Sequence, residues 1–244
     1  RVLLSGPPGS GKEVAARWVH ARSDRAAGPF VVLNAACVQP ERMEEALFGT
    51  ESPDGRVVPG LFERAHAGTL FIDEVAEMPA GAQSKILRVL VDQRFTRVGG
   101  ASTVQVDVRV ISASARDLPG LIAAGRFRED LYHRLSVVPV ETPPLSARRE
   151  DIPALADHFL ARLSEAEGLP RRSLGPDAAA MLQTRDWPGN VRQLRNVMEQ
   201  VVILSPREGD IEPEELPTAA EGGGEGASPI AAAVAALPLR EARE

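Results

Sequence analysis

The chain has 244 residues, of which 43% are apolar and 25% charged, a composition typical of a globular protein with one large or two modest domains. No apolar run approaches eighteen residues and the first residues lack a hydrophobic signal region, so neither a membrane span nor a secretory signal is predicted. The formal net charge of −6 resides in residues 205–244, which hold three Arg and nine Asp or Glu, so a basic nucleic-acid-binding face is excluded.

Strand-like and helix-like segments alternate along the first 142 residues. The patterns predict strands at 2–5, 30–34, 69–73, 104–114 and 137–140, with helices at 12–21, 40–48 and 82–92. Such alternation predicts an α/β domain, a parallel sheet flanked by helices on both faces. Residues 93–105 contain Gly99-Gly100 and predict a small hairpin inserted before the fourth strand.

After Pro143-Pro144 the strand signals stop. Helices are predicted at 152–167, 176–183 and 191–203, which makes residues 143–217 a small all-helical lid subdomain behind the α/β subdomain of 1–142. We expect Trp187 to lie in the lid core. Residues 218–244 are expected to form a flexible linker and the start of a helix leading to a further domain outside the chain.

The single cysteine and the two lysines are conspicuous for their rarity. Cys37 cannot form an internal disulfide, so we expect a reducing cytoplasmic location and interpret Cys37 as a small buried side chain. Among 28 basic residues only Lys12 and Lys85 are lysine. Lys85 is interpreted as a solvated helix residue, whereas Lys12 belongs to a motif.

The stretch GPPGSGKE, between the first strand and the first helix, fits the phosphate-binding pattern G-x-x-x-x-G-K. Its backbone N–H groups are expected to surround phosphates, and Lys12 to reach the β and γ phosphates. The alternative is a Gly/Pro-rich turn that happens to precede a lysine. The predicted ATP-binding residues here are Gly6, Pro7, Pro8, Gly9, Ser10, Gly11, Lys12 and Glu13.

A second motif, TLFIDE, ends an apolar strand in two carboxylates. We expect Asp73 to hold Mg²⁺ directly or through water, and Glu74 to orient and deprotonate the attacking water. Many buried strands end in acids, so the motif is informative because it follows Lys12 by 61 residues in the same predicted sheet.

Longer strings resemble one family. GSGKEVAARWVH, GLFERAHAGTLFIDEVAEMPAGAQSKILRVLVDQRFTRVGG, FREDLYHRLSVVPVETPPLSARREDIPALADHFL and WPGNVRQLRNVMEQVVIL are similar to the AAA+ domain of bacterial enhancer-binding proteins, which are NtrC-like. The resemblance covers about residues 1–217. It implies a P-loop NTPase that uses ATP and Mg²⁺, assembles as a homo-oligomeric ring of six or seven subunits, and remodels RNA polymerase holoenzyme carrying sigma-54. DNA would be bound only by a domain outside this chain.

The resemblance also implies residue roles. Asn34 matches the residue that holds the catalytic Glu74 in an idle position; alternatively, it is an Asn that turns the chain after a strand. Arg128 and Arg134 match arginines presented to the ATP of the neighbouring subunit, and Arg192 matches the lid arginine that senses the γ-phosphate. For Arg128 and Arg134, the alternative is an arginine on a solvated helix face. For Arg192, the alternative is a helix that reads DNA, which the few cations and the apolar stripe of Leu194, Val197 and Val201 disfavour. The implied ATP-binding segment around the second motif comprises Ala65, His66, Ala67, Gly68, Thr69, Leu70, Phe71, Ile72, Asp73 and Glu74.

Three positions depart from the family pattern. Pro7-Pro8 replace the usual Glu-Ser, and Ala115 stands where the family carries a sensor Asn. Between LFGTE and PGLFE, where the family has the GAFTGA loop that grips sigma-54, this chain has only SPDGRVV. We therefore expect a Pro-Asp-Gly turn that closes the gap between two helices, and doubt the usual contact with sigma-54.

Two functions stay open at this stage. The first is a ring-forming ATPase, possessing Lys12, Asp73, Glu74 and the three arginines. The second is a non-enzymatic regulator in which nucleotide binding sets assembly, which Ala115 and the short loop favour.

Overall fold

The computed structural model describes residues 1–168, 171–205 and 209–217, and the chain divides into two compact units between Pro143 and Pro144. Within these described ranges, no helix combines the length and the hydropathy that a membrane crossing requires. The predicted linker and helix start at 218–244 lie outside the described residues.

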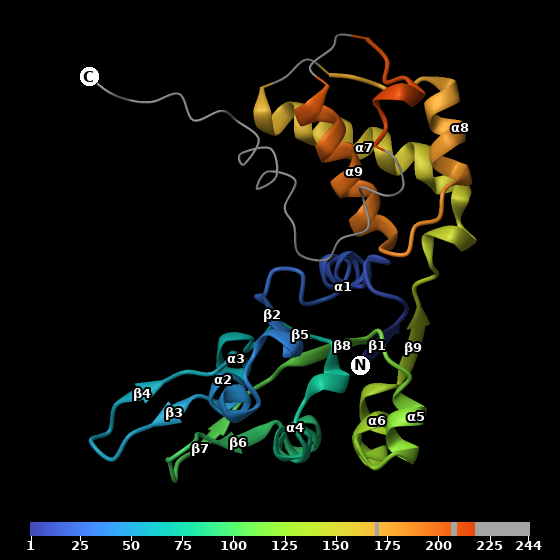
Figure 1. Ribbon diagram of the computed structural model, residues 1–244. Coiled ribbons are helices and arrows are strands. Elements are labelled where there is room, and N and C mark those ends of the chain that lie inside the picture. Colours follow the sequence, from blue (N-terminus) through green and yellow to red (C-terminus); the bar gives the residue numbers. More distant parts are fainter. Residues whose placement is uncertain (169–170, 206–208, 218–244) are drawn as a thin grey trace, which may run out of the picture. The chain divides into compact units, whose positions relative to one another are not determined.

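The first unit is built on a five-stranded sheet in the order β2-β5-β8-β1-β9 (Figure 1). Every neighbouring pair in this sheet is parallel, which confirms the predicted α/β class. The strands are β1 (Val2–Ser5), β2 (Phe30–Asn34), β5 (Thr69–Asp73), β8 (Arg109–Ser114) and β9 (Val138–Glu141).

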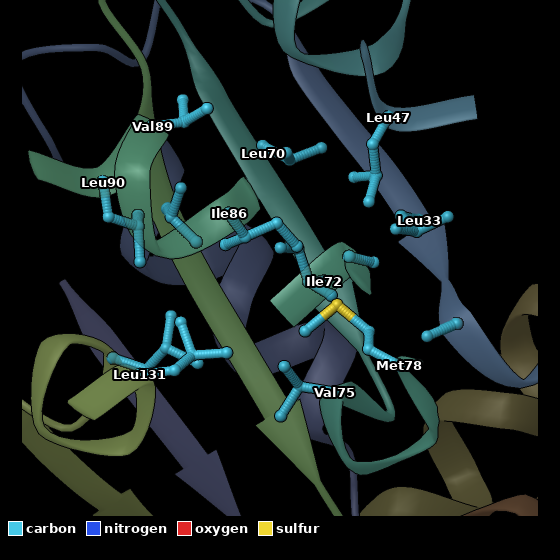
Figure 2. Packing of buried hydrophobic residues seen from close by; sticks show 14 of the residues in the cluster. Leu33, Leu47, Leu70, Ile72, Val75, Met78, Ile86, Val89, Leu90 and Leu131 are labelled. Atoms are coloured by element: carbon cyan, nitrogen blue, oxygen red, sulfur yellow. The ribbon is translucent and has the colours of Figure 1, made fainter. Parts of the chain in front are cut away.

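Helices cover both faces of this sheet, as a parallel sheet requires. Alternate residues of each strand point to opposite faces: Leu70 and Ile72 join one apolar cluster, whereas Phe71 joins the other. Helix α1 (Lys12–Ala21) packs on the Phe71 face. The other face carries the larger cluster, partly drawn in Figure 2. Its helices are α2 (Met43–Phe48), α3 (Leu61–Arg64), α4 (Ala80–Asp92), α5 (Leu118–Ala123) and α6 (Glu129–Leu135).

The strand predicted at 104–114 is divided in the structure. Its start belongs to β7 (Thr103–Gln105), which pairs antiparallel with β6 (Arg94–Thr96) as the predicted hairpin, and only residues 109–114 enter the main sheet as β8. The alternating pattern at 104–108 therefore runs on into β8, although the two segments belong to different strands. Cys37 is exposed, contrary to the prediction, because it ends a 3₁₀ turn that follows the edge strand β2.

Residues 50–58 form a hairpin rather than a bare turn, and we call this segment the short hairpin. Its strands β3 (Thr50–Glu51) and β4 (Val57–Val58) pair antiparallel, and Ser52 N–H donates to Arg56 O at 2.9 Å across the tip. The first strand also exchanges backbone hydrogen bonds with residue 98: Glu51 N–H donates to Val98 O, and Val98 N–H donates to Gly49 O, both at 2.9 Å.

Arg97 joins the base of the short hairpin to the neighbouring elements. Its guanidinium donates to both carboxylate oxygens of Glu63, at 3.0 and 2.6 Å, and to Glu51 at 3.2 Å. This arrangement lowers the pKa of the Glu63 carboxyl below its usual value, chiefly through the hydrogen bond from Arg97. The base of the short hairpin is thus anchored even though its tip is only a few residues long.

The second unit is all-helical over its described residues. It contains α7 (Ile152–Glu167), α8 (Pro176–Thr184) and α9 (Asn190–Leu204). Trp187 lies in the core of this unit, as predicted, and its indole N–H donates to Leu182 O at 3.0 Å. The buried stripe of α9 includes Leu194, Val197 and Val201, which therefore pack the lid rather than read DNA.

Candidate functional site

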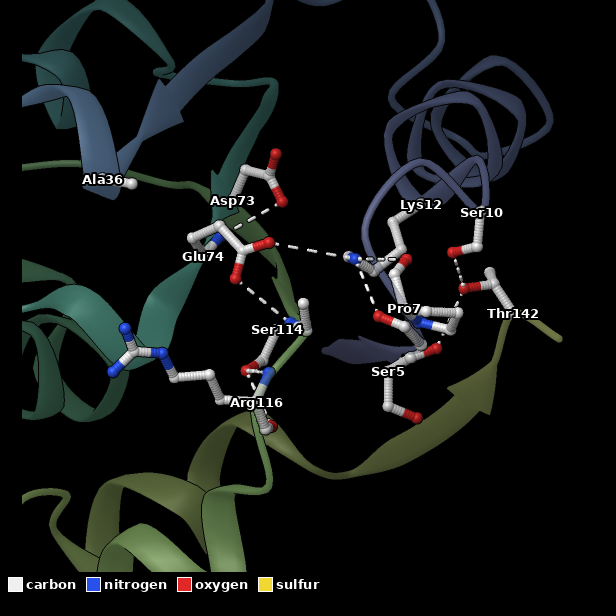
Figure 3. Close-up of polar contacts among 12 residues, drawn as sticks. Ser5, Pro7, Ser10, Lys12, Ala36, Asp73, Glu74, Ser114, Arg116 and Thr142 are labelled. Carbon is white, nitrogen blue, oxygen red and sulfur yellow. Dashed lines mark hydrogen bonds and ion pairs between the residues drawn. The ribbon is translucent and has the colours of Figure 1, made fainter. Parts of the chain in front are cut away.

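The carboxyl ends of all five strands lie at one edge of the first unit, because every strand of the sheet is parallel to its neighbours. In α/β sheets this edge is where ligands bind. The loop after β1 holds residues 6–11, β5 ends at Asp73, and Ala115 follows β8 (Figure 3). The edge therefore gathers a glycine-rich loop, a lysine and two carboxylates from distant parts of the chain.

The glycine-rich loop adopts backbone angles that suit glycine. Gly6, Gly9 and Gly11 have φ values of 146°, 74° and 103°, in the region that L side chains rarely enter. Lys12 begins α1 directly after the loop and is only 6% exposed. Its ammonium donates to Gly6 O at 2.8 Å and to Pro7 O at 3.2 Å, so the lysine curls back over its own loop.

The residue after the edge strand β9, which is the neighbour of β1, contacts this loop. Thr142 follows β9, and its Oγ1 lies 2.8 Å from Ser10 Oγ and donates to Ser5 O at 2.9 Å. A Cβ on Gly6 would lie 2.3 Å from Thr142 O, so the loop approaches β9 more closely than a side chain permits. Thr142 was missed by sequence reasoning; its only signal is a hydroxyl residue just beyond a predicted strand.

Asp73 and Glu74 stand side by side at the end of β5. Asp73 Oδ1 accepts from Glu74 N–H at 3.1 Å, and burial together with the neighbouring Glu74 carboxylate raises the pKa of Asp73. Glu74 Oε1 lies 3.9 Å from Lys12 Nζ, and its Oε2 accepts from the backbone N–H of Ala115 at 3.1 Å. Glu74 has a φ of 50°, unusual for a residue with a side chain.

Asn34 lies opposite Asp73 in the β2–β5 register, yet its side chain turns elsewhere. Its Oδ1 accepts from Ala36 N–H at 3.0 Å and so begins the 3₁₀ turn after β2. In the described residues, Glu74 is bound by Ala115 and Lys12, and Asn34 makes no hydrogen bond to it. This geometry matches the turn interpretation of Asn34, one of the two alternatives left open by the sequence.

Residues 65–72 of the predicted ATP-binding segment are not brought to this edge. Ala65, His66, Ala67 and Gly68 precede β5, at the opposite edge, where Ala67 N–H donates to Asp107 O. Thr69 through Ile72 lie within the strand, and each is fully buried. A strand rises about 3.3 Å per residue, so Gly68 lies roughly 16 Å from Asp73 along the chain. Only Asp73 and Glu74 of that segment reach the edge.

Arg128 and Arg134 differ in what holds them. Arg128 precedes α6 and donates to both carboxylate oxygens of Asp130, at 3.0 and 2.7 Å. Arg134, in the last turn of α6, is exposed and makes no ion pair or side-chain hydrogen bond with another described residue. Arg134 is therefore free to meet another chain, whereas Arg128 would have to leave Asp130.

Arg192 belongs to the second unit. Gly189 precedes α9 and Arg192 lies in its first turn, exposed and with no ion pair to another described residue. The buried Asn190 side chain beside it accepts from Leu145 N–H at 2.8 Å, which ties the start of α9 to the start of the unit.

The described residues contain no cluster of three or more side chains able to hold a metal ion. Glu13, which follows Lys12, accepts two hydrogen bonds from Arg17, at 2.9 and 2.7 Å. Asp73 is thus the carboxylate at this edge that fits a cation, and its pKa is raised by burial and by the neighbouring Glu74 carboxylate. One carboxylate together with phosphate oxygens and waters is the ligand set that Mg²⁺ commonly takes.

Comparison with known families and relatives gives a consistent result. Residues 1–141 match a family described as the sigma-54 interaction domain, and residues 146–232 match one described as the AAA+ ATPase lid domain. The nitrogen assimilation regulatory protein NtrX of Azorhizobium caulinodans is 54% identical over 256 residues, covering all of this chain and 55% of that protein. The transcriptional regulator NtrC of Escherichia coli is 44% identical over 208 residues, covering 84% of this chain and 44% of NtrC. The chain thus spans about half the length of these relatives.

Solved structures agree. A crystal structure of Brucella abortus NtrX in complex with ATP superposes with a TM-score of 0.81 at 54% identity, covering 91% of this chain and 52% of NtrX. A second NtrX structure, in complex with ADP, has the same score and identity and covers 90% of this chain and 50% of NtrX. Hsp104 shares the fold alone, with a TM-score of 0.63 at 19% identity over 83% of this chain and 40% of Hsp104.

Proposed function

Since the chain belongs to the sigma-54 activator family of AAA+ domains, we propose that it binds ATP with Mg²⁺ and hydrolyses it within a homo-oligomeric ring. The observation that carries the proposal is the meeting of Lys12, Asp73 and Glu74 at one sheet edge beside the glycine-rich loop. The whole protein would be a cytoplasmic regulator of transcription.

Each residue has a separate part in the proposed reaction. The loop N–H groups and Lys12 bind the phosphates; Lys12 exchanges its bonds to Gly6 O and Pro7 O for phosphate oxygens. Asp73 holds Mg²⁺, which neutralises charge on the phosphates. Glu74 accepts a proton from the attacking water. Arg134 and Arg128 stabilise γ-phosphate charge on a neighbouring subunit, and Arg192 senses the same phosphate from the lid.

A mixing experiment tests both the hydrolysis and the role of Arg134 between subunits. Glu74→Gln removes the base and keeps the arginines, whereas Arg134→Ala removes the arginine and keeps the base. Each variant alone should lose most Mg²⁺-dependent ATP turnover. A mixture should recover turnover, because a Glu74→Gln subunit can present its Arg134 to an Arg134→Ala neighbour.

The matched control is Arg126→Ala, another exposed arginine near α6 that is assigned no role in the site. It should turn over ATP like the unaltered protein. Turnover per subunit should also rise with protein concentration. The proposal fails if, at concentrations where rings form, the unaltered protein turns over ATP no faster than Glu74→Gln.

We further propose that the short hairpin does not engage sigma-54 in the way the family's GAFTGA loop does. Its tip, residues 52–56, carries no aromatic residue and no threonine. Arg97 binds Glu51 at the base of the hairpin. The domain would then act on RNA polymerase through another surface or on another partner. ATP-driven open-complex formation at a sigma-54 promoter by the full-length protein, lost when Asp54 and Arg56 become Ala, would refute this.

A second candidate function is a nucleotide-binding assembly module without useful turnover. Ala115 favours it, because its methyl side chain offers no hydrogen bond to water or phosphate at the end of β8. The two functions differ in one result. If Glu74→Gln binds ATP, assembles and still supports the regulatory output in cells, nucleotide binding alone suffices.

A further inference from the structure

We propose that the backbone N–H of Ala115, together with the ammonium of Lys12, holds Glu74 in a resting position, and that Asn34 does not. The inference rests on the proposed ATPase function and specifies how that site is restrained. Ala115 would be a positioning residue that acts through its main chain.

The contacts of Glu74 carry the first step. Each carboxylate oxygen has a different partner: Oε2 accepts from Ala115 N–H at 3.1 Å, and Oε1 lies 3.9 Å from Lys12 Nζ (Figure 3). The Glu74 side chain is 23% exposed, so both contacts are partly shielded from water. A base restrained at both oxygens must break these contacts before it can turn toward a water.

Strand geometry explains why the amide of Ala115 is available. The β5–β8 ladder ends at the pair Ile72 and Ser112, and the β1–β8 ladder ends at Ser5 and Ser114, so the Ala115 amide needs another acceptor. Ser114 Oγ accepts from Arg116 N–H at 3.1 Å, and the Glu74 carboxylate accepts from Ala115 N–H. The side chain of residue 115 is only a methyl group and offers Glu74 no competing partner.

The backbone of Glu74 supports the same reading. Its φ and ψ of 50° and 51° are left-handed, and such conformations persist in residues with side chains when surrounding contacts hold them. Glu77 N–H donates to Glu74 O at 2.9 Å, which closes the 3₁₀ turn of Val75–Glu77 that follows Glu74. The main chain therefore aims the Glu74 side chain across the sheet edge toward β8.

Asn34 is already engaged. Its Oδ1 accepts from Ala36 N–H at 3.0 Å, and this bond begins the turn after β2. Releasing Asn34 would leave Ala36 N–H without that acceptor. Glu74 faces the opposite neighbour, since β5 lies between β2 and β8.

Nucleotide would loosen the restraint in two stages. Phosphates draw Lys12 away from Oε1, which leaves the Ala115 amide as the remaining restraint. Glu74 becomes an effective base only when this last hydrogen bond opens. Basal turnover is thereby kept low until a further event, such as contact with a neighbouring subunit, opens it.

The restraint can be measured without any ATP turnover. In nucleotide-free protein labelled with ¹⁵N-alanine, the Ala115 amide signal is assigned by its disappearance in Ala115→Gly. Glu74→Ala should shift this amide proton upfield and speed its exchange with solvent by about tenfold or more, since a bond to a charged acceptor is lost. Asn34→Ala should leave both unchanged.

Glu77→Ala is the matched control for removing a nearby carboxylate. Glu77 pairs with Arg116 at 2.8 Å, one residue from Ala115, so its loss changes local charge without touching the proposed bond. The proposal is overturned if the Ala115 amide ignores Glu74→Ala, or responds equally to Asn34→Ala or Glu77→Ala.

A second arm measures turnover. Ala115→Pro removes the N–H and Ala115→Gly keeps it, so the proline variant should raise kcat at low protein concentration several-fold over the glycine variant, with KM little changed. Equal kcat in two folded variants would contradict the restraint. If the proline variant does not fold, the amide measurement decides alone. Absence of turnover in all variants would remove the proposed function and leave the amide result standing.

Discussion

The glycine-rich loop of residues 6–11 and the short hairpin of residues 50–58 use glycine for different reasons. In the loop, Gly11 has a φ of 103° and open space where a Cβ would lie. At the base of the hairpin, Gly49 has a φ of 72°, and a Cβ there would lie 2.3 Å from Val58 O. The first glycine leaves open space beside the loop, whereas the second lets two backbone segments touch.

This difference separates the chemistry of the domain from its framework. The loop brings Lys12 beside two carboxylates, so it supplies groups that the proposed reaction needs. The hairpin is anchored by Arg97, Glu51 and Glu63 through its base, while its tip makes only local turn contacts. The base of the hairpin is thus fully anchored although its tip is short.

The largest expected effect lies in the loop. Lys12→Ala should weaken ATP binding about a thousandfold, since two charge-assisted contacts of about 2 kcal/mol each would be lost. Titration calorimetry measures the affinity. The other lysine, Lys85, lies on α4 and pairs with Glu44 of α2. The Lys85→Ala variant should bind ATP normally. Equal affinities for the two variants would place the phosphate site elsewhere.

The base of the short hairpin is tested next. Gly49→Ala should lower the free energy of unfolding by about 3 kcal/mol, because its φ and ψ of 72° and 179° suit only glycine and the new methyl group meets Val58 O. Gly55→Ala, with a φ of 82° and nothing within 4 Å, should cost only about 1 kcal/mol. Denaturant unfolding compares them. Similar losses would mean that backbone strain, and not close approach, governs the base.

Arg97→Ala should destabilise the protein by about 2 kcal/mol, since two partly buried carboxylates lose their partner. It should also alter the acid dependence of stability. Arg97 lowers the folded-state pKa of Glu63, so its contribution is present above the unfolded value near 4.3 and is lost as pH falls through the folded pKa. The free energy of unfolding should therefore differ less between pH 7 and pH 3 in Arg97→Ala than in the unaltered protein. An unchanged difference would show that this ion pair does not set the acid response.

The smallest effect is expected at the hairpin tip. Asp54→Ala removes an exposed acceptor that lies 3.3 Å from Arg56 N, and should change stability by no more than about 0.5 kcal/mol. ATP turnover should stay at the level of the unaltered protein. A loss of turnover, measured at matched protein concentration, would show that the hairpin tip influences the candidate site. It would contradict the distinction between the hairpin and the glycine-rich loop.

Much of the framework was predictable from local patterns. The five strands of the sheet, the helices after the first and third strands and the lid helices leave periodic apolar signals, because burial on one face or two dictates residue types. The division at 104–114 was not predictable, since an alternating hairpin strand and an entering sheet strand produce one continuous pattern. The exposure of Cys37 escaped for a related reason: composition does not tell which strand is an edge.

The candidate site shows the same limit. Sequence by itself determined the phosphate loop, the paired carboxylates and the family, because these depend on residue types at fixed spacing. Only the tertiary structure decided that residues 65–72 stay away from the edge, that Thr142 braces the loop, and that Ala115 rather than Asn34 meets Glu74. Those outcomes depend on strand order and on a backbone amide, which every residue except proline possesses, so no side-chain pattern could announce them.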